Sequence, residues 1–372
     1  MNRQNLNLIF DQYIDRFAEL NDPAGNNEGY KWTAESCFMA NWNIDADDFP
    51  SMFKAAMKEM SNLIDNATVQ PIGGILLLLK QKNEVEFVRN CFRELYAEDG
   101  GDIDTRQDRI YAFMEKINAK IDQYAKGSWK YPQTMNSVIY YLCLRYPNEN
   151  YIFKATEATE WANCVEYGDD FGSGQTFSLA KYYKMCDELL DAVSQNEEIM
   201  ELHKDRFGKN AEGFDDELHI LVYDIIYCAH NYHFYTDGMI HTTSTKERIN
   251  RAKAREELDA LNVRIQEISA QISQLTSVEA QSIDMIGLTV THKVFGSGKI
   301  TSQSENIQII SFAVGDKKFQ FPAAYTTGFL KTDDSIMQAL LDAELNAKEI
   351  ERLHSELKSL QDRYDSIGRT FK

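Results

Sequence analysis

The sequence has 372 residues, of which 43% are apolar, 12% aromatic and 26% charged. This composition supports a large buried core divided between two or three domains, and it excludes a mostly disordered chain. The net charge of −19 excludes general binding to phosphate backbones unless positive charge is concentrated in one region.

The cysteines and the apolar runs predict where the protein resides. The six cysteines are scattered between residues 37 and 228 without a Cys-x-x-Cys pair, which predicts reduced thiols and disfavours a disulfide framework or a zinc ribbon. Asp11 and Asp15 interrupt the first apolar residues, unlike a signal peptide, and the longest apolar run, Ile75–Leu79, is too short to span a bilayer. We therefore expect a cytoplasmic protein with no membrane partner.

The first two thirds of the chain predict an acidic all-α domain over residues 1–242. Residues 1–245 carry 22 basic and 40 acidic side chains, a net charge of −18, and their apolar residues recur at helical spacing. Acidic clusters at 45–48, 99–104 and 215–217 lie where helices begin, so we interpret them as helix caps rather than cation sites. The predicted helices cover about 6–20, 49–64, 83–95, 105–124, 137–146, 156–166, 177–194 and 215–233, and the best strand signal is Tyr151–Phe153.

Two heptad patterns predict coiled-coil arms over residues 243–286 and 333–372. The helical part of each arm is 34 residues long, and matched arms favour one antiparallel hairpin. The alternatives are that each arm packs onto the helical domain or drives dimerisation. The predicted seams are Leu258, Leu261, Ile265, Ile268, Ile272 and Leu275, and then Ile336, Ala339, Ala343, Asn346, Ile350, Leu353, Leu357, Leu360, Tyr364, Ile367 and Phe371.

Between the arms, residues 287–332 predict a small β-barrel of the SH3 or Tudor type at the tip of the hairpin. The β-rich segments are separated by turn residues, and a sheet this small hides its edges by closing. Residues 289–331 hold five lysines against Glu305 and Asp316, a net charge of +3. The β-rich segments are Thr289–Phe295, Lys299–Gln303, Ile307–Val314 and Lys317–Phe321.

Part of the helical domain resembles a known family. YKWTAESCFMANWNIDADDFPSMFKAA, NSVIYYLCLRYPNENYIFK and DDELHILVYDIIYC together resemble the helical region ahead of the GTPase in McrB-like restriction proteins, over residues 5–235. The resemblance implies a recognition or adaptor module of a bacterial defence or restriction system, with a separately encoded motor, nuclease or polymerase as partner. The string GSGKIT at 296–301 is no phosphate loop, because Ile300 follows Lys299 where Ser or Thr is required.

A second segment, VTHKVFGSGKI followed by KKFQFPAAY, is similar to the Tudor-like barrels at the tails of bacterial repair helicases. In those relatives the module binds protein, notably RNA polymerase, or nucleic acid. A small barrel leaves aromatic side chains partly exposed, so we expect a partner-binding site of apolar anchors ringed by lysines. The alternative is that the aromatic residues only fill the barrel. The expected residues are Lys293, Phe295, Lys299, Lys317, Lys318, Phe319, Phe321 and Tyr325.

Signals for chemistry are few, and we expect no cofactor, no bound metal and no catalytic residues. The densest candidate group is Cys228, His230, His233 and His241 with Asp224 and Asp237, which we interpret as the end of a helix rather than a metal site. Tyr30, Trp32 and Trp42 could stack on a base, although aromatic residues at helical spacing are usually core.

These observations predict a mainly α, non-catalytic recognition or adaptor protein that binds a protein or, through its barrel, a nucleic acid. One alternative is a metal-dependent nuclease or hydrolase using the His230/His233 region. The other alternative is a structural coiled-coil homo-oligomer.

Overall fold

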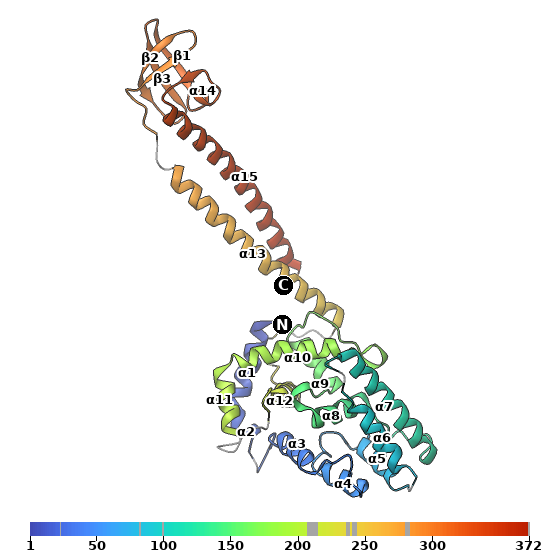
Figure 1. The fold of residues 1–372 in the computed structure, drawn as a ribbon. Helices are drawn as coiled ribbons and strands as arrows, with labels where there is room; N and C mark the ends of the chain where they lie inside the picture. The colour runs from blue at the N-terminus through green and yellow to red at the C-terminus, as the bar shows by residue number, and fades with distance from the viewer. Residues whose placement is uncertain are drawn as a thin grey trace. The chain divides into compact units, whose positions relative to one another are not determined.

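The computed structural model describes residues 1–22, 24–81, 83–98, 100–206, 215–235, 239, 244–279 and 283–370. The chain divides into two compact units, Met1–Ala252 and Lys253–Lys372. It is mostly helical, with one small sheet in the C-terminal unit (Figure 1). No helix within these described ranges is both long enough and apolar enough to cross a membrane.

The N-terminal unit is built from helices around one core, as its apolar periodicity predicts. The strand expected at Tyr151–Phe153 is wrong: this buried segment joins two helices and pairs with no strand among the described residues. The helices are α1 (Arg3–Asp15), α2 (Phe17–Leu20), α3 (Tyr30–Asn41), α4 (Phe49–Ala56), α5 (Pro71–Leu79), α6 (Val85–Leu95), α7 (Ile103–Tyr124), α8 (Met135–Arg145), α9 (Ala155–Cys164), α10 (Leu179–Ser194), α11 (Glu197–Arg206) and α12 (His219–Asn231), with short 3₁₀ turns at Pro147–Glu149 and Gly174–Thr176.

Aspartates cap several of these helices, as the sequence predicts. The Asp48 carboxylate accepts a hydrogen bond from the Ser51 amide at 3.1 Å, and the Asp102 carboxylate accepts one from the Asp104 amide, in the first turn of α7, at 3.2 Å. Asp215 accepts from the amides of Ile220 and Leu221 at 3.0 and 2.9 Å. Each bond satisfies an amide that the helix itself leaves unpaired. Asp99, placed in the same group by its sequence, lies outside the described residues.

The boundary between the units falls at 252, ten residues later than the predicted end of the first domain. The long helix α13 (Thr245–Glu279) begins in the N-terminal unit, because side chains of its first turns contact residues of that unit. The Arg248 guanidinium is buried and donates to the backbone carbonyls of Tyr167 and Asp169, the latter at 2.8 Å. Ala252, one turn further, is also buried.

The C-terminal unit holds a five-stranded antiparallel half-barrel in the order β4-β3-β2-β1-β5. The predicted β-rich segments each contain a strand, but β1 and β3 end earlier than predicted, and the glycine-containing connections at 296–298 and 315–316 form the starts of β2 and β4. The order runs through consecutive hairpins, and β5 returns to pair with β1. The strands are β1 (Thr289–His292), β2 (Gly296–Gln303), β3 (Ile307–Phe312), β4 (Gly315–Gln320) and β5 (Leu330–Lys331), with the short helix α14 (Ala323–Thr326) before β5.

The VTHKVFGSGKI segment shapes the first hairpin. Nδ1 of His292 accepts from the amides of Val294 and Phe295 at 3.1 and 3.2 Å, which fixes the turn between β1 and β2. Gly296 has a φ of 74°, which favours glycine, and a Cβ on Gly298 would lie 2.6 Å from the Phe312 ring. The GSGKIT string is therefore part of a strand, not a phosphate loop.

Helices α13 and α15 (Asp334–Thr370) lie side by side within the C-terminal unit (Figure 1). Arg264 donates to Glu356 at 3.0 Å, and Arg363 donates to Glu257 through Nε at 2.7 Å. Leu261, Ile268 and Leu353 are buried, and the other predicted seam residues with described side chains are half-buried, except Ala339 and Tyr364, which are exposed. Leu340 is buried in place of Ala339, because it packs against the core of the half-barrel. Phe371 lies outside the described residues.

Candidate partner-binding site

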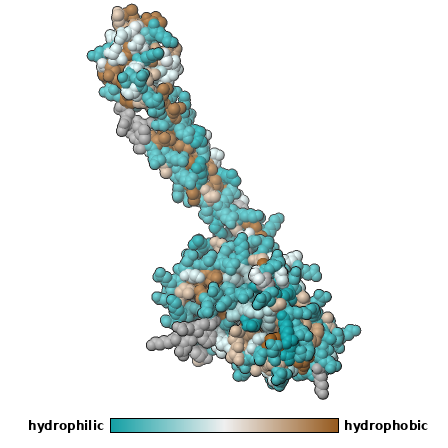
Figure 2. Space-filling view, viewed as in Figure 1, coloured by the Kyte–Doolittle hydropathy of each residue, from teal (hydrophilic) through white to brown (hydrophobic). Residues whose placement is uncertain are grey.

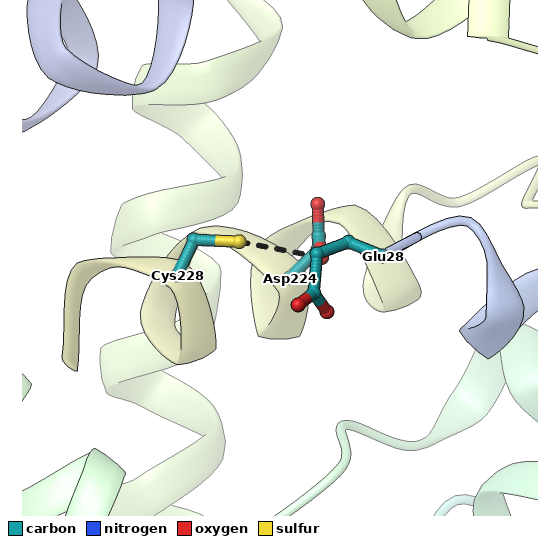
Figure 3. Close-up of side chains that lie close together, drawn as sticks. All are labelled: Glu28, Asp224 and Cys228. Atoms are coloured by element: carbon teal, nitrogen blue, oxygen red, sulfur yellow. Dashed lines mark hydrogen bonds between the residues drawn. The ribbon is translucent and has the colours of Figure 1, made fainter. Parts of the chain in front are cut away.

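Glu28, Asp224 and Cys228 lie close together in the core of the N-terminal unit, with ligand atoms within 4.8 Å of one another (Figure 3). Within the described part of the chain this is the one group with the spacing of a metal site. Its carboxylates, however, already bind two buried cations. Asp224 accepts from Lys31 at 2.7 Å and from Arg206 at 3.2 Å, and Glu28 accepts from Lys31.

The arrangement is an internal ion-pair network. Burial alone would raise the pKa of Asp224, but the charges of Lys31 and Arg206 outweigh burial and hold this pKa at about 2. The Tyr13 hydroxyl donates to the same carboxylate at 2.6 Å, so every partner of Asp224 favours its ionised form. Burial raises the pKa of the Cys228 thiol, which disfavours the thiolate that binds metals. We interpret the network as structural.

Two of the histidines that the sequence grouped near Cys228, His230 and His233, are described by the structure, and they do not form a site with it. His230 is half-buried, and its Nδ1 lies 2.6 Å from the Glu160 carboxylate. His233 follows the end of α12 with a φ of 57°. His241 and Asp237 lie outside the described residues. The described residues therefore bring neither histidine into a group of metal ligands.

The three aromatic residues suggested for base stacking are packing residues. Trp32 is 1% exposed, its indole donates to Asp215 at 3.2 Å, and the Arg206 guanidinium lies over its ring at 4.1 Å. Trp42 contacts an aromatic cluster that joins α3, α4 and α6. Tyr30 is half-buried against the same core. The stacking hypothesis is wrong for Trp32, because no base can reach a buried ring.

The half-barrel carries an aromatic cluster on its inner face, formed by His292, Phe295, Phe312 and Phe319. The His292 ring stacks on Phe295 at 4.5 Å and lies 5.4 Å from Phe319, and Phe312 packs behind them. Phe312 is buried, while the other three rings are half-buried and so present part of their surface to solvent. The Lys317 ammonium lies 5.6 Å from the centre of the Phe295 ring.

The predicted lysines do not ring this cluster together. Successive residues of a strand face opposite sides of the sheet. Lys317 pairs with the buried Ile310 and therefore faces inward, whereas Lys318 and Lys299 face outward. Lys293 is exposed in the turn between β1 and β2. The cluster thus has Lys317 and Lys293 beside it, and Lys318 and Lys299 on the far face.

Two of the predicted aromatic contacts also belong elsewhere. Tyr325 is 1% exposed and donates to Gln308 at 2.7 Å, so its prediction as a binding residue is wrong: it fills the core. Phe321 is half-buried against Tyr325 at the other end of the sheet, where its amide donates to Asn306. Of the four predicted aromatic residues, Phe295 and Phe319 therefore lie in one cluster, whereas Phe321 and Tyr325 lie outside it.

Residues that the sequence analysis missed lie beside the cluster. Val294, Val314 and Phe329 are 79%, 63% and 61% exposed, although they are large and apolar. Each lies within two residues of a glycine with positive φ, in a connection between strands. An apolar residue next to a turn glycine is the sequence signal that could have identified them.

Comparison with known proteins gives no family for the chain. No family model, curated protein or solved structure matches it.

Proposed function

We propose that this chain is a non-catalytic recognition or adaptor protein that binds a protein partner through its C-terminal unit. The observation that carries this proposal is the half-exposed cluster of His292, Phe295 and Phe319 with Lys317 beside it. Aromatic rings that are partly exposed on a rigid sheet are typical anchors of protein interfaces. The +3 charge of residues 289–331 favours an acidic partner, whereas the −18 charge of residues 1–245 repels one.

We further infer that α13 and α15 form an antiparallel coiled-coil hairpin that carries an SH3- or Tudor-like half-barrel. Two ion pairs support it: going from Arg264 to Glu257 moves back seven residues, and going from Glu356 to Arg363 moves forward seven. The contacts thus move one heptad toward the N-terminus of α13 while they move one heptad toward the C-terminus of α15, as in an antiparallel coiled coil. The return of β5 to β1 is the pairing by which a small barrel closes.

Cross-linking tests the hairpin. A short bismaleimide cross-linker should join the two cysteines of the Glu257→Cys/Arg363→Cys variant within one chain in dilute solution, because the native Glu and Arg side chains bridge these two positions. Links formed only between chains would favour the alternative of a structural coiled-coil oligomer. Exposed apolar residues along the two helices, such as Val263 and Leu345, are the observation that keeps this alternative open.

The setting in a bacterial defence or restriction system rests on the McrB-like resemblance alone. A neighbouring gene for a motor or nuclease would support it. The hydrolase alternative is tested by metal analysis of the purified protein. A bound metal ion that is lost in His230→Ala would favour this alternative.

The adaptor proposal is tested by selecting random peptides displayed on phage against the full chain. We expect enriched peptides whose affinity falls about tenfold in Lys317→Glu, because the reversed charge lies beside the aromatic cluster. Lys318→Glu is the matched control, since it makes the same charge change on the outer face. If no peptide is enriched, or if all bind the two variants equally, the cluster is not a protein-binding site.

A further inference from the structure

Three exposed apolar side chains lie at the same end of the half-barrel. Val294 is in the turn after β1, whose last residue His292 pairs with Gly296. Val314 is in the turn after β3, whose last residue Phe312 pairs with Gly298 in the same part of β2. This end is called the turn end below.

The third residue reaches the turn end through β5. Leu330 pairs with His292 and Lys331 with Thr291, so Phe329 lies beyond His292, across from the turn that holds Val294. Figure 2 shows apolar side chains exposed on the half-barrel. Three separate strand connections thus present Val294, Val314 and Phe329 around the half-buried rings of Phe295 and His292.

The charges at the turn end are mainly positive. Lys293 lies in the first turn, and Lys317 lies over Phe295. Lys331 pairs with the exposed Thr291 and follows the buried Leu330, so it faces the outer side of the sheet. Asp316 is at the same end, but it is next to Lys317 in the strand and so faces the outer side of the sheet. Glu305 is in the turn between β2 and β3, at the other end.

We propose that the turn end binds a protein segment in which a large apolar side chain is flanked by carboxylates. This inference rests on the proposed function and names its partner. The apolar side chain would pack among Val294, Val314 and Phe329 and against the exposed part of Phe295. The carboxylates would pair with Lys293 and Lys317, which flank that space.

A protein segment fits this surface better than an anionic bilayer does. A bilayer can contact the projecting side chains, and lysines would favour its charge. A protein side chain can in addition pack on the exposed part of the half-buried rings, and burial of such anchors dominates the energy of protein interfaces. The three projecting residues are two valines and one phenylalanine, a small apolar area for stable membrane attachment.

The test compares two ends of one sheet in the full chain. Phe329→Ser and Val314→Ser remove apolar surface at the turn end. Ile307→Ser removes an apolar side chain, 46% exposed, at the other end. Circular dichroism checks that each variant keeps the fold. For peptides selected on the unaltered chain, we expect acidic residues beside a large apolar one, and an affinity at least tenfold lower in Phe329→Ser and less than twofold lower in Ile307→Ser.

The other outcomes separate the two proposals. Selected peptides that bind Phe329→Ser and Val314→Ser as tightly as the unaltered chain would overturn the turn end as the site, while the adaptor function would stand. Failure to select any peptide would overturn both. Binding to vesicles of 70% phosphatidylcholine and 30% phosphatidylserine that is lost in Phe329→Ser, without peptide binding, would show a membrane surface. Self-association by light scattering that is lost in Phe329→Ser would show that a second copy occupies it. Either of these last two results contradicts the proposal.

Discussion

The two units treat apolar and charged side chains in opposite ways. The N-terminal unit buries Lys31, Arg206 and Asp224 in its core and pairs them with one another. The C-terminal unit leaves apolar residues exposed: of the 13 large apolar side chains with the greatest exposure in the described residues, ten lie in it. Burying charged groups has a desolvation penalty, which their mutual pairing must offset. A group of exposed apolar side chains is typical of a surface that binds a partner. The contrast separates a unit whose packing depends on its own buried ion pairs from a unit whose apolar side chains stay exposed.

The largest expected effect comes from breaking the buried network. Asp224→Asn removes the charge that compensates Lys31 and Arg206, so we expect a loss of about 3–5 kcal/mol in the free energy of unfolding. All four tryptophans lie in the N-terminal unit, so urea unfolding followed by their fluorescence reports this unit alone. Asp45→Asn, which breaks the exposed pair with Arg93, is the control and should leave the midpoint unchanged. Equal effects of the two variants would contradict the account.

The second prediction concerns pH. Burial, and then the charges of Asp215 and Asp216, raises the pKa of Glu35 to about 8. The folded state therefore holds a proton that the unfolded chain releases near its ordinary pKa of 4.5. The stability from this proton is complete at low pH and is lost as the pH rises from about 4.5 to 8, at about 1.4 kcal/mol for each pH unit.

Glu35→Gln should remove this dependence, because the amide carries no charge at any pH. Thermal unfolding from pH 5 to pH 9 checks it: relative to the unaltered chain, the unfolding midpoint of the variant should rise steadily from pH 5 to about pH 8. Parallel curves across the range would show that Glu35 titrates near its ordinary pKa.

A smaller effect is expected where α13 begins. Arg248→Ala removes charged hydrogen bonds to the carbonyls of Tyr167 and Asp169, which costs about 1.5–3 kcal/mol. Tryptophan fluorescence in urea should show the loss, because residues up to 252 belong to the N-terminal unit. Lys246→Ala, which removes an exposed cation two residues before Arg248, serves as the control. An unchanged midpoint for Arg248→Ala would move the boundary back toward 242.

The smallest effect belongs to the exposed ion pairs between α13 and α15. Arg264→Ala should leave the urea midpoint, followed by circular dichroism at 222 nm, within error of the unaltered chain, because solvent and salt screen such pairs. A clear shift would mean that these pairs, rather than the half-buried apolar seam, hold the two helices together.

Local pattern predicted much of the fold. Helical periodicity identified most helices of the N-terminal unit and both long helices, and β-rich segments with turn residues identified four strands. It missed α3, α5 and α11: α11 has few apolar residues, and α5 is apolar on nearly every face and so shows no periodicity. It placed the domain boundary too early because the contacts of Arg248 are 79 and 81 residues distant. The pairing of Lys31 with Asp224 joins residues 193 apart, which no local pattern shows.

The candidate site was predicted in part. The sequence pointed to Phe295, Phe319 and Lys317, but it grouped Lys318 with them, although the two-residue period of a strand separates their faces. Tyr325 was predicted to contact a partner, because an aromatic residue in a small barrel can face the core or the solvent. Its hydrogen bond to the buried Gln308 places it in the core, and the sequence does not show this bond. The turn-end residues were missed, because exposure of an apolar residue depends on how three connections meet.

Hydrogen–deuterium exchange on the full chain, with and without a selected peptide, tests the central claim most directly. We expect slower exchange on peptide binding in the segments 293–296, 313–316 and 328–331, which form the turn end. We expect no change in 304–307 at the other end of the sheet, nor in α1–α12. Protection confined to the helices of the N-terminal unit, with unchanged exchange at the turn end, would contradict this claim.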